Sequence, residues 1–154
     1  MRTDLRPRTK RVRQGVVSVA AAVAVIGGIN FALAPSASAS GYGCSGSVVY
    51  SKNLMVEGKA WSTAYLYYSS ANGGTNCAVL VAKKWAGTRH FMHISIQLSG
   101  VGSGLKKDEG QFTSYAGPVT LTHTNGHCIS GTMWENSPDD NNQAGDAINK
   151  VACG

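Results

Sequence analysis

Hydrophobic and polar residues alternate along several short stretches of this chain, which is the pattern of strands with one buried face. The clearest stretch is 90–98, whose two faces differ: one carries Met92, Ile94, Ile96 and Leu98, the other Phe91, His93, Ser95 and Gln97. Residues 60–69 alternate in the same way, and runs over 47–51 and 76–85 predict two further strands.

Two turn sequences indicate how neighbouring strands pair. The run Ser-Ala-Asn-Gly-Gly-Thr at 70–75 predicts a hairpin between the strands on either side of it. Asn125-Gly126 predicts a second hairpin, with a two-residue turn, that joins 118–124 to 127–134. In that register one buried face carries Val119, Leu121, His123 and Cys128.

Polar segments are interpreted as loops between the strands. Residues 99–110 predict a glycine-rich loop with Lys106-Lys107-Asp108-Glu109 as its charged tip. Residues 135–146 predict a second long loop, and 146–151 fit a short helix or a strand equally well. About five to seven short antiparallel strands with glycine-based turns predict an all-β sandwich or barrel.

The N-terminal 39 residues have the features of a secretory signal peptide. Six basic residues precede an apolar run over 16–34, and Ala37-Ser38-Ala39 fits a cleavage site, so a single domain over 40–154 is expected to be secreted. Cleavage after Ala34 is an alternative that would leave Pro35 first. A membrane anchor also remains open, because the run is nearly long enough to span a bilayer.

The positive charge of the chain belongs mostly to this leader. The whole chain has 14 Lys and Arg against 8 Asp and Glu. Residues 1–39 hold six of the basic side chains and Asp4, which leaves 8 basic and 7 acidic side chains in 40–154. A nucleic-acid or anionic-membrane partner requires clustered basic residues, so neither is expected once the leader is removed.

All 4 cysteines lie in the predicted mature part of the chain. In an exported protein they are expected to form two disulfides, and three pairings are possible. We favour Cys44–Cys77 and Cys128–Cys153, the pairing of sequence neighbours. A four-cysteine zinc site is not favoured, because no Cys-x-x-Cys pair is present.

The histidines and carboxylates do not predict a catalytic or metal centre. His90 and His93 are three residues apart in a strand, so they point to opposite faces. No nucleophile motif is recognisable, and the acidic run 139–146 lacks the spaced ligands of a calcium loop. The chain is therefore expected not to be an enzyme and to hold no cofactor or metal.

Two groups of residues are candidates for a binding surface. Trp61, Tyr65 and Tyr67 fall on one face of the strand at 60–69, where aromatic side chains form either core or a flat platform. Leu105 and Lys106 belong to the predicted loop at 99–110 and would be exposed on it.

The chain resembles the spore-associated protein A family of secreted actinobacterial proteins. The resemblance covers most of 40–154 and rests on the order of short motifs: Gly43-Cys44-Ser45-Gly46, Asn76-Cys77-Ala78-Val79, Thr113-Ser114-Tyr115-Ala116-Gly117-Pro118-Val119, Gly126-His127-Cys128-Ile129 and Cys153-Gly154. The chain departs from the family pattern after Cys128 and over 137–144. The resemblance implies an extracellular protein associated with spores or the cell surface.

These observations lead to three functional hypotheses. The first is a secreted, non-enzymatic structural or interaction protein whose partners are spore or cell-envelope components. The second is an inhibitor of extracellular proteases, which would present the loop around Leu105-Lys106. The third is a carbohydrate-binding module that uses Trp61 and Tyr65.

Overall fold

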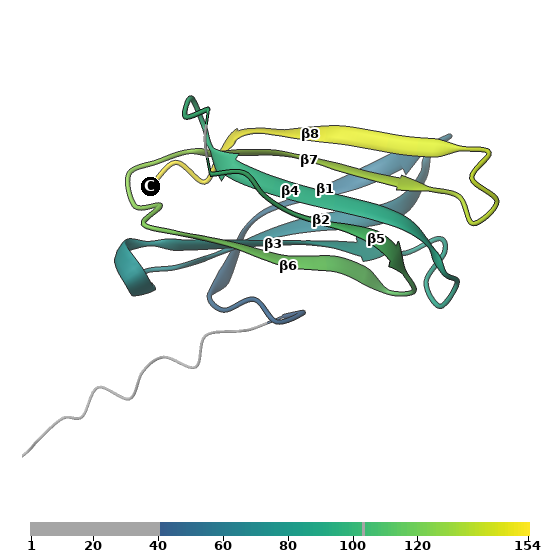
Figure 1. Ribbon diagram of the computed structural model, residues 1–154, viewed down its shortest axis with the longest axis horizontal. Coiled ribbons are helices and arrows are strands. Elements are labelled where there is room, and N and C mark those ends of the chain that lie inside the picture. The colour runs from purple at the N-terminus through teal and green to yellow at the C-terminus, as the bar shows by residue number, and fades with distance from the viewer. Residues whose placement is uncertain (1–40, 103) are drawn as a thin grey trace, which may run out of the picture. The chain divides into compact units, whose positions relative to one another are not determined.

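Two antiparallel sheets pack face to face in the computed structural model, which describes residues 41–102 and 104–154 (Figure 1). The first sheet has the order β1-β2-β3-β6 and the second β5-β4-β7-β8. The strands are β1 (Ser47–Val56), β2 (Lys59–Ser69), β3 (Thr75–Ala82), β4 (His90–Leu98), β5 (Lys106–Phe112), β6 (Tyr115–Thr122), β7 (Ile129–Asn136) and β8 (Gln143–Val151). The predicted all-β sandwich is confirmed. The eight strands of these described ranges exceed the expected number, and the predicted signal peptide lies outside them.

The core lies between the sheets and is built by the alternation visible in the sequence. Met92, Ile94 and Ile96 of β4 are fully buried and meet Leu66 and Leu80 of the opposite sheet. Burial of each such side chain stabilises the fold by about 1.5–3 kcal/mol relative to exposure. The prediction of a strand over 90–98 with this inward face is confirmed.

The predicted hairpin around 70–75 is also confirmed. β2 and β3 pair antiparallel from Ser62↔Ala82 to Ser69↔Thr75, and a short 3-10 turn at Ala71–Gly73 joins them. Glycines with positive φ at 73 and 74 allow the chain to reverse there.

The predicted hairpin around Asn125-Gly126 is wrong. β6 pairs with β3 in the first sheet, whereas β7 pairs with β4 and β8 in the second. A turn does form, because the His127 N–H donates to the Thr124 carbonyl and Gly126 has a φ of 76°. However, the segment after β6 crosses from one sheet to the other, and its backbone at 123–125 hydrogen-bonds to the 72–74 turn. His123 is exposed there rather than buried.

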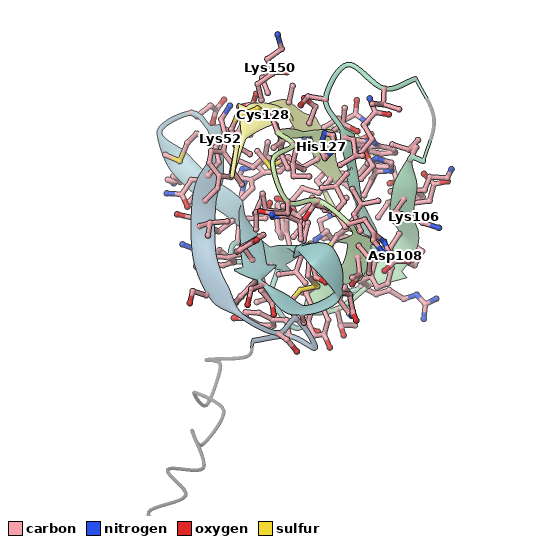
Figure 2. The ribbon with its side chains drawn as sticks, turned by 90° about the vertical axis from the view of Figure 1, so that its left-hand side faces the viewer. Lys52, Lys106, Asp108, His127, Cys128 and Lys150 are labelled. Carbon is pink, nitrogen blue, oxygen red and sulfur yellow. A yellow bond between two sulfur atoms is a disulfide. The ribbon has the colours of Figure 1, made fainter. Side chains whose placement is uncertain are left out.

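The segment predicted as a charged loop tip is instead an edge strand. β5 pairs with β4 from His90↔Phe112 to Ile96↔Lys106, so the loop is confined to 99–105. Figure 2 labels Lys106 and Asp108 on this strand, at the opposite side of the fold from Lys52 on β1. Charged side chains are common on edge strands, because they discourage pairing with another chain. The charge run therefore reflected an exposed strand edge.

The second predicted loop, 135–146, is also shorter than expected. β7 continues to Asn136 and β8 begins at Gln143, so only 137–142 connects them. The segment 146–151, for which helix and strand were both open, is part of β8. Asp146 of β8 forms an ion pair with Lys52 of β1 at 2.6 Å, which joins the two sheets along one side.

Both disulfides have the favoured pairing, Cys44–Cys77 and Cys128–Cys153. The first fixes the segment 41–46 over the outer face of the first sheet, where Cys44, Cys77, Tyr67 and Val79 form a small buried cluster. A side chain at Gly41 would overlap the Tyr67 hydroxyl, which shows how closely this segment covers the sheet. The outer face of the second sheet has no such cover among the described residues. In the described ranges, none of the helical segments has the length and apolarity needed to cross a membrane.

Candidate functional site

A groove of about 550 Å³ runs along the outer face of the second sheet. Two small residues, Gly131 of β7 and Ala147 of β8, form the floor of the groove and leave it open. The side chains around this floor are mostly hydroxyls and amides: Ser95, Ser130 and Thr132 supply hydroxyls, and Gln97 and Asn149 supply amides. Leu105 and Lys107 of the β5 side complete one wall together with His93.

His93 is the centre of a hydrogen-bonded chain in this groove. Its Nδ1 lies 2.9 Å from Glu109 Oε2 and its Nε2 lies 3.1 Å from Thr132 Oγ1. The Thr132 hydroxyl is in turn 2.8 Å from the Ser95 hydroxyl, which also accepts the Thr132 N–H at 3.1 Å. With Nδ1–H donated to the carboxylate, Nε2 is free to accept a hydrogen bond from the Thr132 hydroxyl.

Strand register explains why these side chains meet. Glu109 lies directly opposite His93 across the β4–β5 pair, and Thr132 lies opposite Ser95 across the β4–β7 pair. His93 and Ser95 share the outer face of β4, as the alternation predicted. Three adjacent strands therefore contribute one polar cluster, although its members are distant in sequence.

Aromatic rings hold the imidazole of His93 in place. The Trp134 ring stacks on His93 with 5.4 Å between ring centroids and on Phe91 with 4.7 Å. His93 is 8 % exposed, while Thr132 is an exposed residue on the groove surface. The histidine is therefore fixed from several sides, and the threonine that it contacts lines the groove.

The carboxylate of Glu109 is kept ionised by its neighbours. Hydrogen bonds from Lys107, and secondly from His93, lower the pKa of this carboxyl below its usual value. Lys107 and Glu109 also form an ion pair on the exposed edge of β5. The charged groups of the groove wall thus compensate one another locally.

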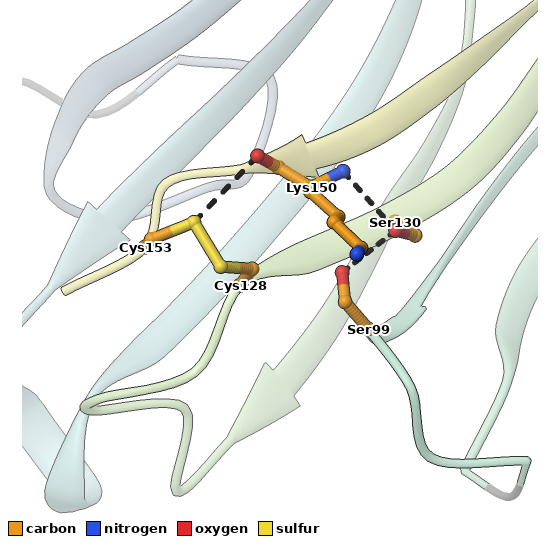
Figure 3. Close-up of a disulfide and its surroundings, with 5 residues drawn as sticks. All are labelled: Ser99, Cys128, Ser130, Lys150 and Cys153. Carbon is orange, nitrogen blue, oxygen red and sulfur yellow. Dashed lines mark hydrogen bonds between the residues drawn. A yellow bond between two sulfur atoms is a disulfide. The ribbon is translucent and has the colours of Figure 1, made fainter.

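One end of the groove adjoins the Cys128–Cys153 disulfide (Figure 3). The Ser130 hydroxyl, which lines the groove, is 2.7 Å from the Ser99 hydroxyl and accepts the Lys150 N–H at 3.2 Å. A bulge in the β7–β8 pairing between Ile129 and Gly131 brings the backbone at Lys150 to this serine. The hydroxyl is therefore held in one position by two other segments.

The aromatic residues proposed as a platform do not form one. Trp61 and Tyr67 are 3 % and 6 % exposed, and Tyr65 is half-buried. Trp61 packs edge-on against Trp85, and the Lys84 ammonium lies over both rings. Tyr67 lies under the segment 41–46, where burial raises the pKa of its hydroxyl. These side chains are packing elements of the first sheet.

The other two candidate residues are accessible; Leu105 lies in the loop as expected, whereas Lys106 does not. Leu105 is 53 % exposed and forms part of the groove wall. Lys106 is exposed at the first position of β5 and is therefore part of an edge strand. The extended loop that the inhibitor hypothesis requires is reduced to 99–105.

The remaining histidines are separate from the groove. His123 and His127 are exposed in the crossing segment, and His123 Nδ1 is 3.2 Å from the Thr122 hydroxyl. The side chains of the connection 137–142 bond to one another: Asp139 accepts hydrogen bonds from Ser137 and Asn141, which lower the pKa of its carboxyl. Among the described residues, no cluster of three or more metal-ligating side chains is present.

His90 lies on the opposite face of β4, inside the sandwich, as the alternation predicted. Its Nε2 is 3.1 Å from Glu135 Oε2, its Nδ1 is 2.8 Å from the Thr88 carbonyl oxygen, and the side chains of His90 and Glu135 are fully buried. Burial raises the pKa of the Glu135 carboxyl above its usual 4.5, although the hydrogen bond to His90 opposes this. The Thr88 carbonyl can only accept, so His90 Nδ1–H donates to it and Nε2 faces the Glu135 carboxyl.

We expect the free energy of unfolding of Glu135→Gln to increase, relative to that of the native chain, as the pH rises. A raised folded pKa means that the folded state retains a proton that the unfolded state loses above pH 4.5, so the native chain loses stability between that pH and the folded pKa. The glutamine amide has no proton to lose in this range and can still donate to His90. Urea unfolding of both proteins at pH 4 and pH 7 measures this. If the variant is less stable than the native chain at pH 7 by more than at pH 4, Glu135 is ionised and favourably paired in the folded state.

Sequence reasoning missed Thr132 and Glu109 as partners of His93. The shared face of His93 and Ser95 on β4 was a usable signal. Nothing local indicated that β5 and β7 flank β4, because Glu109 was assigned to a loop and Thr132 to a strand paired elsewhere.

No family model, curated protein or solved structure matches the chain. The resemblance to the spore-associated protein A family therefore stays a prediction. The two disulfides are consistent with an extracellular protein.

Proposed function

We propose that this protein is exported and acts at the cell or spore surface by binding a surface component through the groove of the second sheet. The observation that carries this proposal is the contrast between the two outer faces. The first is covered by the segment 41–46, which the Cys44–Cys77 disulfide fixes in place. The second carries a groove on β4, β7 and β8.

The lining of the groove favours a neutral ligand rich in hydroxyl groups. Ser95, Ser130 and Thr132 can each donate and accept hydrogen bonds, as can the amides of Gln97 and Asn149. The charges of Lys107 and Glu109 are paired with each other, so the wall has little attraction for an ionic ligand. Glycans of the cell or spore envelope have this hydroxyl-rich chemistry and are available to an exported protein.

Binding of the exported chain to envelope glycans tests the proposal. Ala147→Trp should reduce co-sedimentation with purified cell-wall and spore-coat polysaccharide at least about tenfold, because the indole would occupy the groove. Ser51→Trp on β1 is the matched control, since it adds the same ring to an exposed strand position of the other sheet that does not line the groove. Equal binding by both variants, or none by the native chain, would refute the glycan site.

A further inference from the structure

The groove contains the parts of an acyl-transfer site, which goes beyond binding. Nucleophilic catalysis requires a hydroxyl, a base within hydrogen-bond reach of it and a group that orients the base. Thr132, His93 and Glu109 occupy these three positions at 3.1 Å and 2.9 Å. Thr132 is an exposed residue that lines the groove and His93 is nearly buried beside it, so a substrate in the groove lies against the threonine.

We propose that Thr132 accepts acyl groups from esters of small carboxylic acids, with His93 as its general base. This departs from the expectation that the chain is not an enzyme. It uses the proposed binding groove, but it does not depend on which glycan binds there. In the envelope, the corresponding substrate class is an acyl ester of a sugar hydroxyl.

The reaction balances without any cofactor. The Thr132 Oγ1 attacks the ester carbonyl carbon while His93 Nε2 takes its proton. The carbonyl carbon then loses the alcohol oxygen, and His93 returns the proton to this leaving group. Water repeats the sequence on the acyl-threonine, releasing the acid and restoring the hydroxyl. The Gln97 and Asn149 amides line the same groove, and the scheme assigns to them the N–H donors for the negatively charged oxygen of the intermediate.

Glu109 and Trp134 are positioning residues in this scheme. Glu109 accepts the Nδ1–H of His93 and so presents Nε2 in its unprotonated form to the threonine hydroxyl. Trp134 stacks on the imidazole and limits its rotation. A purely structural cluster would make the same contacts but would not transfer an acyl group, so reactivity separates the two roles.

The test uses 4-nitrophenyl acetate as a small probe that does not require glycan binding. The native exported chain should release 4-nitrophenol and carry an acetyl group that mass spectrometry of peptides locates on Thr132. Thr132→Val keeps the shape of the side chain and should abolish that adduct, whereas Thr132→Ser should retain it. His93→Gln should lower the rate of release about 100-fold or more, the range of general-base catalysis.

His123→Gln is the matched control, because His123 also lies beside a threonine hydroxyl but no carboxylate contacts it among the described hydrogen bonds. This variant should react at the native rate. Glu109→Gln should lower the rate of release while the acetyl group still appears on Thr132, whereas loss of a purely structural contact would not change the reactivity of this one hydroxyl. Equal rates for the native chain and Thr132→Val, or acetylation confined to lysines or other histidines, would overturn the proposal. Neither outcome bears on glycan binding, which Ala147→Trp tests separately.

Discussion

Replacing Cys128 and Cys153 together by serine should lower the free energy of unfolding by about 2–5 kcal/mol. The bond spans 25 residues, so its loss frees the unfolded chain to explore many more conformations. It also connects the start of β7 to the residues after β8, beside the end of the groove. Urea unfolding of the double variant and of the native chain gives the difference directly.

The other disulfide provides a comparison of similar size. Cys44 and Cys77 are 33 residues apart, so removing this pair by the same double substitution should cost a similar free energy in the chain-entropy description. The two double variants act at different places: only the loss of Cys44–Cys77 frees the segment 41–46 that covers Tyr67. An unfolding midpoint that does not change in either variant would contradict a structural role for the bonds.

Gly131→Ala should destabilise the fold by about 1–3 kcal/mol, which is the usual cost of overpacking. A methyl group at this position would overlap the backbone carbonyl oxygen of Ser95 in the neighbouring strand β4. Backbone cannot move aside as a flexible side chain can, so β4 and β7 would have to separate. The same separation would disturb the contact between Ser95 and Thr132.

Gly145→Ala is the matched control on the adjacent strand β8. Its methyl group would lie 3.2 Å from Trp134 Cβ, a tight contact with a side chain, and 3.6 Å from the nearest backbone atom. We therefore expect a change below about 1 kcal/mol there. Thermal and urea unfolding of both variants compare the two sites. Equal losses at 131 and 145 would show that close backbone approach at Gly131 is not the cause.

The sequence was most informative where a strand is buried on one face. β4 was predicted with correct bounds because Met92, Ile94 and Ile96 alternate with polar residues, and burial of one face enforces that alternation. β5 was missed because an edge strand needs no apolar face: only Phe112 at its end is a large apolar residue. Its charged residues resemble a loop in composition.

The pairing of strands that are distant in sequence could not be predicted from the local residue pattern. Asn125-Gly126 correctly indicated a turn, but a turn specifies only a local reversal and not which strands pair beyond it. The pairing of β7 with β4 depends on the whole sandwich and on the disulfide at Cys128. The cluster around His93 depends on that pairing, so its chemistry became visible only with the fold.

The position of the groove on β4 and β7 has a consequence for the timescale on which its residues move. Both strands are paired on each side within the second sheet, so their amide hydrogens should exchange with solvent only in rare, large opening events. The segment 41–46 has few backbone bonds and should exchange much earlier. A ligand would therefore meet a surface that is already ordered before binding, and association would proceed without a preceding conformational step.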